Sequence, residues 1–293
     1  MKQMKLSVII PSLNAADTIA TQLEALASQR WSEPWEVIIS DNGSTDKTLA
    51  IIERYGNRLL NLHVVDSSDR RGAAHARNVG AQAATGDALA FCDADDEVAS
   101  DWVAAIGEAL REYDLVASRF DIEKLNAPWV QKSRENPQID GLQRLWYPPY
   151  LSHASGSGLG LKRSLHEAVG GFDESFCFLE ETDYCLRIQL AGVKIHFVPD
   201  AVVYYRYRHT FGGIFHQGRH YATWNVLLYK TYWTPGVETS RPWKRYVSGW
   251  RSLLRRLLQI RDKGTLARWV WLLGWRVGLL QGSIRYRVPP VPG

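Results

Sequence analysis

Three carboxylates follow directly on an apolar run in the segment 87–96, and their spacing suits cation chemistry. Asp93, Asp95 and Asp96 come immediately after the apolar residues 88–92. A run of that length predicts a buried strand of an α/β sheet, and open sheets of this kind bind ligands at the carboxyl ends of their strands. Asp93 and Asp95 are two positions apart, so on extended backbone their side chains share one side. Such oxygens suit Mg²⁺ or Mn²⁺ carrying substrate phosphates; a solvated acidic loop is the alternative.

Charged residues also stand beside two other predicted elements. Asp41 follows the second predicted strand, where a carboxylate could pair with the base or ribose of a nucleotide. Arg70, Arg71 and Arg77 surround the start of a predicted helix at 72–84. Guanidinium charge and the helix dipole both suit that place to a diphosphate. The alternatives are that Asp41 only forms a turn and that Arg77 is a surface residue.

A second acidic group stands at the start of another predicted helix. Glu180, Glu181 and Asp183 precede a helical periodicity that runs over 184–190 and ends at Gly192. Acidic residues in a first turn are stabilised by the helix dipole, which would explain one or two of them. Three carboxylates exceed what capping needs and leave room for a general base.

Short strands and helices alternate along the first 120 residues. We expect helices beginning near residues 17, 45, 72 and 102, and strands at 6–10, 36–40, 60–65, 87–92, 114–120 and 158–161. This alternation predicts an α/β fold with a doubly wound, mostly parallel sheet. From about 126 to 157 the pattern gives way to a stretch rich in Pro, Trp and Tyr, which suits stacking on sugar rings or packing in a core.

Charge is distributed unevenly along the chain. Its formal net charge is +4, but residues 1–240 carry 23 Lys and Arg against 30 Asp and Glu, whereas residues 241–293 carry 12 against 1. A basic tail on an acidic body predicts an anionic partner, either a membrane surface or nucleic acid. The three cysteines form no paired framework, and no long signal-peptide core precedes the first strand. A reducing, cytoplasmic location is therefore expected.

The tail has the periodicity of amphipathic helices. Apolar residues recur at helical spacing over 211–233, and a Trp and Leu stripe over 250–258 has arginines beside it. The apolar segment 266–280 is interrupted by Arg268 and Arg276 and is too short to span a bilayer. This pattern predicts an interfacial helix, with the protein peripheral on the inner face of the membrane. A helix packed on the rest of the protein is the alternative, and the Trp and Leu periodicity argues against nucleic acid.

Taken together, these motifs resemble family-2 glycosyltransferases with the GT-A fold over roughly residues 5–210. The matching pieces are short, but their order and spacing are specific: 8–14, 41–46, 71–72, 76–80, 86–87, 93–96, 170–174 and 180–183 with Arg187. The resemblance implies a Rossmann-like, mostly parallel mixed sheet flanked by helices, followed by a helical, basic C-terminal extension. Residues 1–210 would form the catalytic domain, with a nucleotide-sugar half at about 1–100 and an acceptor half at about 101–210. Residues 211–293 would form the extension.

The resemblance also implies an activity. A sugar would pass from a nucleoside diphosphate donor, expected to be a UDP-sugar, to a glycan, lipid-linked or other hydroxyl acceptor. The reaction would need Mn²⁺ or Mg²⁺, would invert the configuration at the sugar carbon, and would serve the synthesis of cell-surface polysaccharide or glycoconjugate.

Site residues follow from the matched motifs. The residues implied for the donor are Pro11, Ser12, Asn14, Asp41, Ser44, Arg71, Arg77, Asp93 and Ala94. Asp93 and Asp95 match the metal-binding Asp-x-Asp motif. His209 and His216 are candidates for a further metal ligand, and a structural role is the alternative for either histidine. The family's Glu-Asp pair reads Glu180-Glu181 here, so Glu181 takes the place of the catalytic aspartate, with Asp183 as the other candidate base.

Two alternatives remain open. One is a nucleotidyltransferase, which would be expected to carry a glycine-rich, basic signature after the first strand, and residues 12–15 are not one. The other is a catalytically silent protein that binds a sugar nucleotide or a glycan. Turnover of any donor separates that protein from an enzyme.

Overall fold

The computed structural model describes residues 3–136, 138–233 and 242–289, with side chains of the last range described from residue 246. The chain forms two compact units. The first consists of Met1–Asp121, Pro137–Gln143 and Ser152–Tyr205, and the second of Ile122–Asn136, Arg144–Leu151 and Arg206–Gly293.

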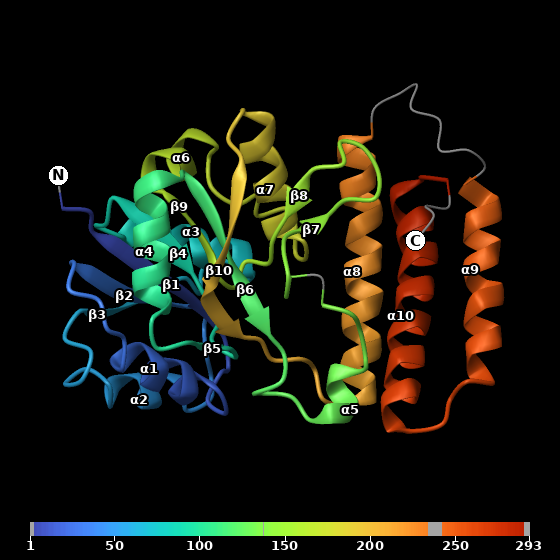
Figure 1. Ribbon diagram of the computed structural model, residues 1–293, viewed down its shortest axis with the longest axis horizontal. Helices are drawn as coiled ribbons and strands as arrows, with labels where there is room; N and C mark the ends of the chain where they lie inside the picture. The colour runs from blue at the N-terminus through green and yellow to red at the C-terminus, as the bar shows by residue number, and fades with distance from the viewer. Residues whose placement is uncertain (1–2, 137, 234–241, 290–293) are drawn as a thin grey trace. The chain divides into compact units, whose positions relative to one another are not determined.

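The first unit is built on an eight-stranded sheet with the order β3-β2-β1-β4-β9-β6-β10-β5 (Figure 1). Its strands are β1 (Leu6–Ser12), β2 (Trp35–Asp41), β3 (Leu62–Asp66), β4 (Ala88–Phe91), β5 (Glu97–Val98), β6 (Leu115–Asp121), β9 (Leu159–Lys162) and β10 (Ile195–Tyr204). Its helices are α1 (Ile19–Ala27), α2 (Thr48–Glu53), α3 (Ala73–Ala83), α4 (Trp102–Glu112), α6 (Arg163–Ala168) and α7 (Glu180–Leu190).

The sheet is mixed and mostly parallel. β1 runs parallel to β2 and β4, β2 parallel to β3, and β6 parallel to β10. β9 lies antiparallel between β4 and β6, and the short β5 lies antiparallel to β10. The fold class expected from the alternation of strands and helices is confirmed.

Apolar residues cover both faces of this sheet. Leu6, Val8 and Ile10 join one core with residues of α1 and α4, while Ile9 points into a second core with residues of α3 and α7. Successive side chains of a strand alternate between the two faces, so a strand buried on both sides reads as a continuous apolar run. This is why β1, β2 and β4 were visible in the sequence.

β10 was not predicted, because its sequence contains a turn-like dipeptide. Pro199 and Asp200 interrupt the run, and the pairing with β6 shifts register between Val198 and Val202. Such an irregularity lets the strand resume beyond a residue that cannot donate to the ladder.

Three helices dominate the second unit: α8 (Phe211–Tyr232), α9 (Pro242–Leu257) and α10 (Lys263–Tyr286). The short helix α5 (Pro128–Gln131) also belongs to it. A separate two-stranded ladder pairs β7 (Gln143–Arg144) with β8 (Ser152–His153). The stretch 126–157, expected to be irregular, therefore contains three short elements.

Glycines allow α8 and α10 to pack closely. A Cβ atom at Gly274, Gly278 or Gly282 of α10 would collide with backbone oxygens of α8. α10 begins at a capping box, in which the Asp262 carboxylate accepts a 2.7 Å hydrogen bond from the Thr265 backbone N–H. α10 lies between α8 and α9 (Figure 1). Among the residues that the structure describes, no helix has the length and apolar content needed to cross a membrane.

Candidate active site

Three neighbouring parallel strands end at the same edge of the first unit's sheet. β1 ends at Ser12, β2 at Asp41 and β4 at Phe91, and Ser12 lies opposite Asp41 in the β1–β2 ladder. The crevice beyond such strand ends is where open α/β sheets bind their ligands. The predicted donor residues at the strand ends are therefore brought together.

Among the described residues, the buried polar atoms without a hydrogen-bond partner include two at the ends of β1 and β2. They are Asp41 Oδ1 and Ser12 Oγ. The other carboxylate oxygen of Asp41 accepts hydrogen bonds from the backbone N–H groups of Gly43 (3.1 Å) and Ser44 (2.9 Å). Burying a polar atom without a partner costs free energy, so this place suits a ligand that supplies hydrogen-bond donors.

Asn14 and Ser44 fasten the loops after β1 and β2 to each other. The Asn14 backbone N–H donates to Ser44 Oγ at 2.9 Å, and Asn14 Oδ1 accepts from the Thr45 backbone N–H at 2.8 Å. Asn14 has φ of 48°, a left-handed conformation that asparagine adopts more readily than most residues. These hydrogen bonds hold the loops after β1 and β2 together.

Asn42 connects these loops to the start of α3. Its side-chain NH₂ donates to the Arg70 carbonyl at 2.8 Å, and its Oδ1 accepts from the Gly72 backbone N–H at 2.9 Å. Arg71 Nη1 donates to the Asn42 carbonyl at 2.9 Å, which holds this predicted diphosphate residue beside the β2 loop. Asn42 belongs to the matched motif 41–46, but no role was predicted for it, and the turn-forming sequence after β2 is the signal that could have indicated one.

Arg77 of α3 connects the two acidic groups. Its Nη1 donates to Glu180 Oε1 at 2.6 Å and its Nη2 to Asp93 Oδ1 at 2.8 Å. The side chain is only 4% exposed, so it is not a surface residue. Burial acts against its charge, but the carboxylates of Asp93, Glu180 and Glu181 outweigh this and raise the pKa of Arg77. The strand-end and helix-start carboxylates therefore belong to one site.

The carboxylate oxygens of Asp93, Asp95 and Asp96 are placed so that they could bind one divalent cation. One oxygen from each lies within 4.8 Å of the others, the spacing of oxygen ligands around one such ion. Arg77 uses Oδ1 of Asp93 and leaves that residue a second oxygen. Ala94, between the aspartates, is buried in the core below. No other group of at least three metal-type side chains was found in the described residues.

Glu181, at the start of α7, has a raised pKa. α7 begins after Leu179, whose left-handed φ of 62° turns the chain into the helix. Burial, together with the neighbouring Glu180 carboxylate, raises the pKa of Glu181 to about 8. A carboxylate of that basicity can accept a proton near neutral pH.

Asp183 is occupied in a structural network. It is 3% exposed and accepts a 2.7 Å hydrogen bond from Arg187 Nε. The guanidinium also donates to the carbonyls of Val169 (2.8 Å) and Gly171 (2.7 Å). Asp183 thus orients the arginine that fastens the Gly-Gly loop after α6.

Asn78 fastens the segment after that loop to α3, a role that was not predicted. Its NH₂ donates to the Phe172 carbonyl at 2.9 Å and to Glu174 Oε1 at 3.0 Å. Glu174 also pairs with Arg70 and His75. The two candidate metal histidines, His209 and His216, both belong to the second unit, and His209 lines a pocket there.

The fold and the site define a class of protein. The first unit has a Rossmann-like mixed sheet. At its strand ends, a cluster of carboxylates suited to a cation lies beside a buried arginine. This is the arrangement of a nucleotide-dependent transferase with the GT-A fold. A sequence profile described as glycosyl transferase family 2 matches residues 7–170, and one described as glycosyl transferase family group 2 matches residues 141–286. The chain belongs to glycosyl transferase family 2.

Individual relatives agree with this assignment. The chain is 28% identical over 250 residues to the amylovoran biosynthesis glycosyltransferase AmsB of Erwinia amylovora, a match covering 81% of this chain and 79% of AmsB. It is 38% identical over 125 residues to the uncharacterized glycosyltransferase YibD of Escherichia coli, covering 43% of this chain and 34% of YibD. This match therefore spans about a third of YibD's length.

Solved structures share the fold. The mannosyltransferase PcManGT of Pyrobaculum calidifontis, solved with GDP-Man and Mn²⁺, aligns with a TM-score of 0.65 at 20% identity over 96% of this chain and 88% of that chain. The S. aureus TarS 1–349 structure aligns with a TM-score of 0.56 at 21% identity over 97% and 92%.

Arg77→Met is expected to destabilise the protein by about 3–5 kcal/mol, because it leaves the buried Glu180 carboxylate and the partly buried Asp93 carboxylate without their counter-charge. Urea unfolding followed by circular dichroism measures this. Arg70→Met is the matched control, since Arg70 also contacts a glutamate but is 65% exposed. It should cost about 1 kcal/mol or less. Equal losses in the two variants would show that Arg77 does not hold the site together.

Proposed function

We propose that this chain is an enzyme that transfers a sugar from a nucleoside diphosphate donor, a UDP-sugar, to a hydroxyl acceptor with inversion. The observation that carries the proposal is the contact of one buried arginine, Arg77, with both Asp93 and Glu180. This contact supports a single site in which carboxylates suited to a cation lie beside a candidate base. We assign catalysis to residues 1–210, with the halves 1–100 and 101–210, and an accessory role to the extension 211–293.

We assign the nucleotide of the sugar donor to the edge of the sheet formed by the carboxyl ends of β1, β2 and β4. We assign the nucleoside to Pro11, Ser12, Asn14 and Ser44, with the base on Asp41. Asp41 Oδ1 and Ser12 Oγ are the groups that gain partners there. Arg71 and Arg77 are assigned to the ribose and diphosphate side.

We assign the cation to Asp93 and Asp95, with Ala94 between them in the motif. The carboxylate of Asp96 lies within 4.8 Å of both. His209 or His216 is proposed as a further ligand. When bound there, Mn²⁺ or Mg²⁺ supplies positive charge that stabilises the leaving diphosphate.

The transfer itself is a single displacement. The Glu181 carboxylate accepts the proton of the acceptor hydroxyl while that oxygen bonds to the anomeric carbon. The bond from this carbon to the diphosphate oxygen breaks, and the nucleoside diphosphate leaves with both electrons. We propose Glu181 as the base, because Asp183 is already held by Arg187.

The names of relatives support an acceptor of the cell-surface glycan type. AmsB is named for amylovoran biosynthesis, and a 97-residue match at 39% identity is to the poly(ribitol-phosphate) β-N-acetylglucosaminyltransferase TarS of Staphylococcus aureus. We propose that the acceptor is a glycan or a lipid-linked precursor. We propose a reducing, cytoplasmic compartment, in which the free thiols of Cys92, Cys177 and Cys185 would persist.

Release of the donor's nucleotide tests the proposal. UDP-, GDP-, dTDP- and CMP-sugars are each incubated with the protein and Mn²⁺, and the freed nucleotide is quantified. Turnover of UDP-sugars that stops when EDTA removes the metal is expected. Binding without any turnover would favour a silent sugar-nucleotide-binding protein. Formation of a nucleotide sugar from a nucleoside triphosphate and a sugar phosphate would favour a nucleotidyltransferase.

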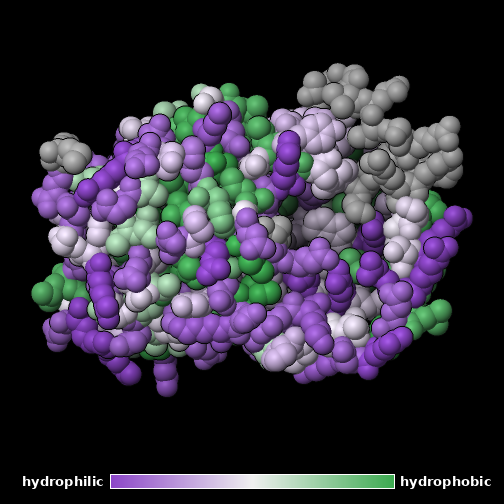
Figure 2. Space-filling view, in the orientation of Figure 1, coloured by the Kyte–Doolittle hydropathy of each residue, from purple (hydrophilic) through white to green (hydrophobic). Residues whose placement is uncertain are grey.

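We also propose that α9 meets an anionic membrane surface. Leu253 is buried, and its carbonyl accepts a 3.0 Å hydrogen bond from Trp269 of α10, so part of the predicted stripe packs inward. The outward face carries the exposed apolar residues Val247, Leu254 and Leu258 interleaved with Arg251 and Arg255. Green and purple surface alternate there (Figure 2). Apolar side chains among arginines are the pattern of an interfacial helix.

The double change Leu254→Ser and Leu258→Ser is expected to weaken binding of the full chain to vesicles containing phosphatidylglycerol by about tenfold or more. Vesicle flotation measures this, with phosphatidylcholine vesicles as the neutral reference. Leu60→Ser is the control, because Leu60 is equally exposed but belongs to the first unit. A full chain that ignores anionic vesicles, or an equal loss with the control, would contradict the membrane proposal.

A further inference from the structure

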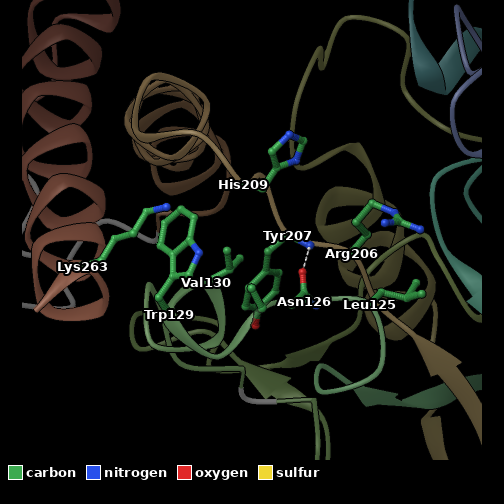
Figure 3. A pocket seen from close by; sticks show the side chains of 9 residues that line it. Leu125, Asn126, Trp129, Val130, Arg206, Tyr207, His209 and Lys263 are labelled. Atoms are coloured by element: carbon green, nitrogen blue, oxygen red, sulfur yellow. Dashed lines mark hydrogen bonds between the residues drawn. The ribbon is translucent and has the colours of Figure 1, made fainter.

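The second unit contains a pocket of about 360 Å³ (Figure 3). Its lining comes from the segment around α5, from the residues just before α8, and from the first residue of α10. The lining residues are Leu125, Asn126, Ala127, Trp129, Val130, Arg206, Tyr207, His209 and Lys263. A pocket of this size accommodates about one or two sugar units rather than a long stretch of chain.

The lining is basic. The lining contains the basic residues Arg206 and Lys263 and the imidazole of His209, and no carboxylate is among the lining residues. Figure 3 places Lys263 on one side and Arg206 on the other, with Tyr207 and Asn126 between them. The nearby Asp262 carboxylate faces Lys132 at 3.6 Å and caps α10. A pocket lined by basic residues, with no acidic residue in its lining, favours an anionic ligand.

Aromatic contacts hold the basic side of the pocket in place. The Lys263 ammonium lies 3.8 Å from the centroid of the Trp129 ring, and this ring in turn packs on Phe211 with centroids 5.6 Å apart. A cation on an aromatic face is stabilised there while its N–H groups stay available to an acceptor. Lys263 is thereby positioned at the pocket before a ligand binds.

The floor of the pocket is rigid. Tyr207 is buried, its backbone N–H donates to Asn126 Oδ1 at 2.7 Å, and the Arg134 guanidinium lies 4.0 Å from the centroid of its ring. A preformed floor lowers the entropy cost of binding.

We propose that this pocket binds an anionic group, a carboxylate or a phosphate, carried by a sugar or polyol unit of the acceptor. Lys263 meets the charge, Arg206 adds to the basic lining, and Trp129 provides the apolar wall beside the unit. That the ligand is an acceptor rests on the proposed function; that the pocket selects acidic glycans rests on its lining alone.

Calorimetric titration of the full chain tests this without any donor. The probes are tri-galacturonate for the carboxylate, a glycerol phosphate trimer for the phosphate, and galactotriose as the neutral match. Acidic probes are expected to bind at least tenfold more tightly than galactotriose, since hydrogen bonds to charged groups are the strong ones. Lys263→Gln should weaken acidic-probe binding about tenfold and leave galactotriose unaffected.

Lys230→Gln is the control, because this lysine of α8 is charged and exposed but does not line the pocket. Preference for one acidic probe identifies the anion, and preference for both confirms the shared chemistry. The proposal is overturned if acidic and neutral probes bind equally, if neither acidic probe binds, or if Lys230→Gln weakens binding as much as Lys263→Gln. A parallel titration of the full chain with UDP and Mn²⁺ separates the two hypotheses. If the acidic probes bind but UDP does not, the proposed function is contradicted and the proposal for the pocket stands.

Discussion

The Asp95→Asn protein is expected to release nucleoside diphosphate from a UDP-sugar at least about a hundredfold more slowly than the wild type at saturating Mn²⁺. Asparagine is close to aspartate in shape, so the fold should persist. It lacks the charge that, in the proposed site, would hold a divalent cation beside the leaving diphosphate, and charge stabilisation of this kind contributes about 10²–10³ in rate. Steady-state assays across a Mn²⁺ titration measure the loss.

Asp114→Asn is the matched control for that loss, because Asp114 is an exposed aspartate in the connection between α4 and β6. It should leave turnover and its Mn²⁺ dependence unchanged. Thermal unfolding of both variants verifies that the fold is intact. Turnover in Asp95→Asn at the wild-type rate and with the wild-type Mn²⁺ dependence would remove Asp95 from the cation site.

The Glu181→Gln protein is expected to bind UDP and Mn²⁺ normally but to transfer sugar about 10²–10⁴-fold more slowly, the usual contribution of a general base. The wild-type rate should rise with pH towards the pKa of Glu181, about 8, because only the deprotonated carboxylate accepts the proton. The variant's profile should lack this rise. Initial rates of transfer from pH 5.5 to 9 measure both effects.

Stability supplies an independent check on Glu181. Its pKa is higher in the folded protein than the ordinary value of 4.5, so between pH 4.5 and about 8 the folded state binds more protons than the unfolded state. This residue's contribution to the free energy of unfolding therefore falls as pH rises through that window. Glu181→Gln should gain stability relative to wild type between pH 5 and pH 9.

Asp183→Asn provides the contrast. It should lower stability, because Asp183 positions Arg187 and through it the carbonyls of Val169 and Gly171. If Asp183→Asn loses transfer with its stability intact while Glu181→Gln keeps it, the base is Asp183.

Local patterns predicted the sheet better than its connections. The apolar runs at 6–10, 36–40 and 87–92 correspond to β1, β2 and β4, because strands buried on both faces need unbroken apolar sequence. The antiparallel direction of β9 could not be predicted in this way, since pairing direction depends on the path of the chain between strands. The register shift in β10 could not be predicted either, because it depends on pairing with β6, which is remote in sequence. Locally, Pro199 and Asp200 resemble a turn and indicate the end of a strand.

The site was predictable residue by residue but not as a network. The aspartates of 93–96 were visible because three carboxylates follow a strand. The link from Arg77 to Glu180 joins residues 103 positions apart, and no spacing rule reports it. Asp183 and Arg187 are four apart on a helix, a pair that the sequence does display, and this spacing could have suggested that Asp183 is engaged.

The most direct test of the central claim is thermal stabilisation of the full chain by UDP and by uridine, each with Mn²⁺ and with EDTA. The account predicts that UDP with Mn²⁺ raises the melting temperature well above any effect of uridine, and that this excess disappears with EDTA and in Asp95→Asn. Equal stabilisation by UDP in Mn²⁺ and in EDTA, or an undiminished effect in Asp95→Asn, would contradict a cation-bridged nucleoside diphosphate at the carboxyl ends of β1, β2 and β4.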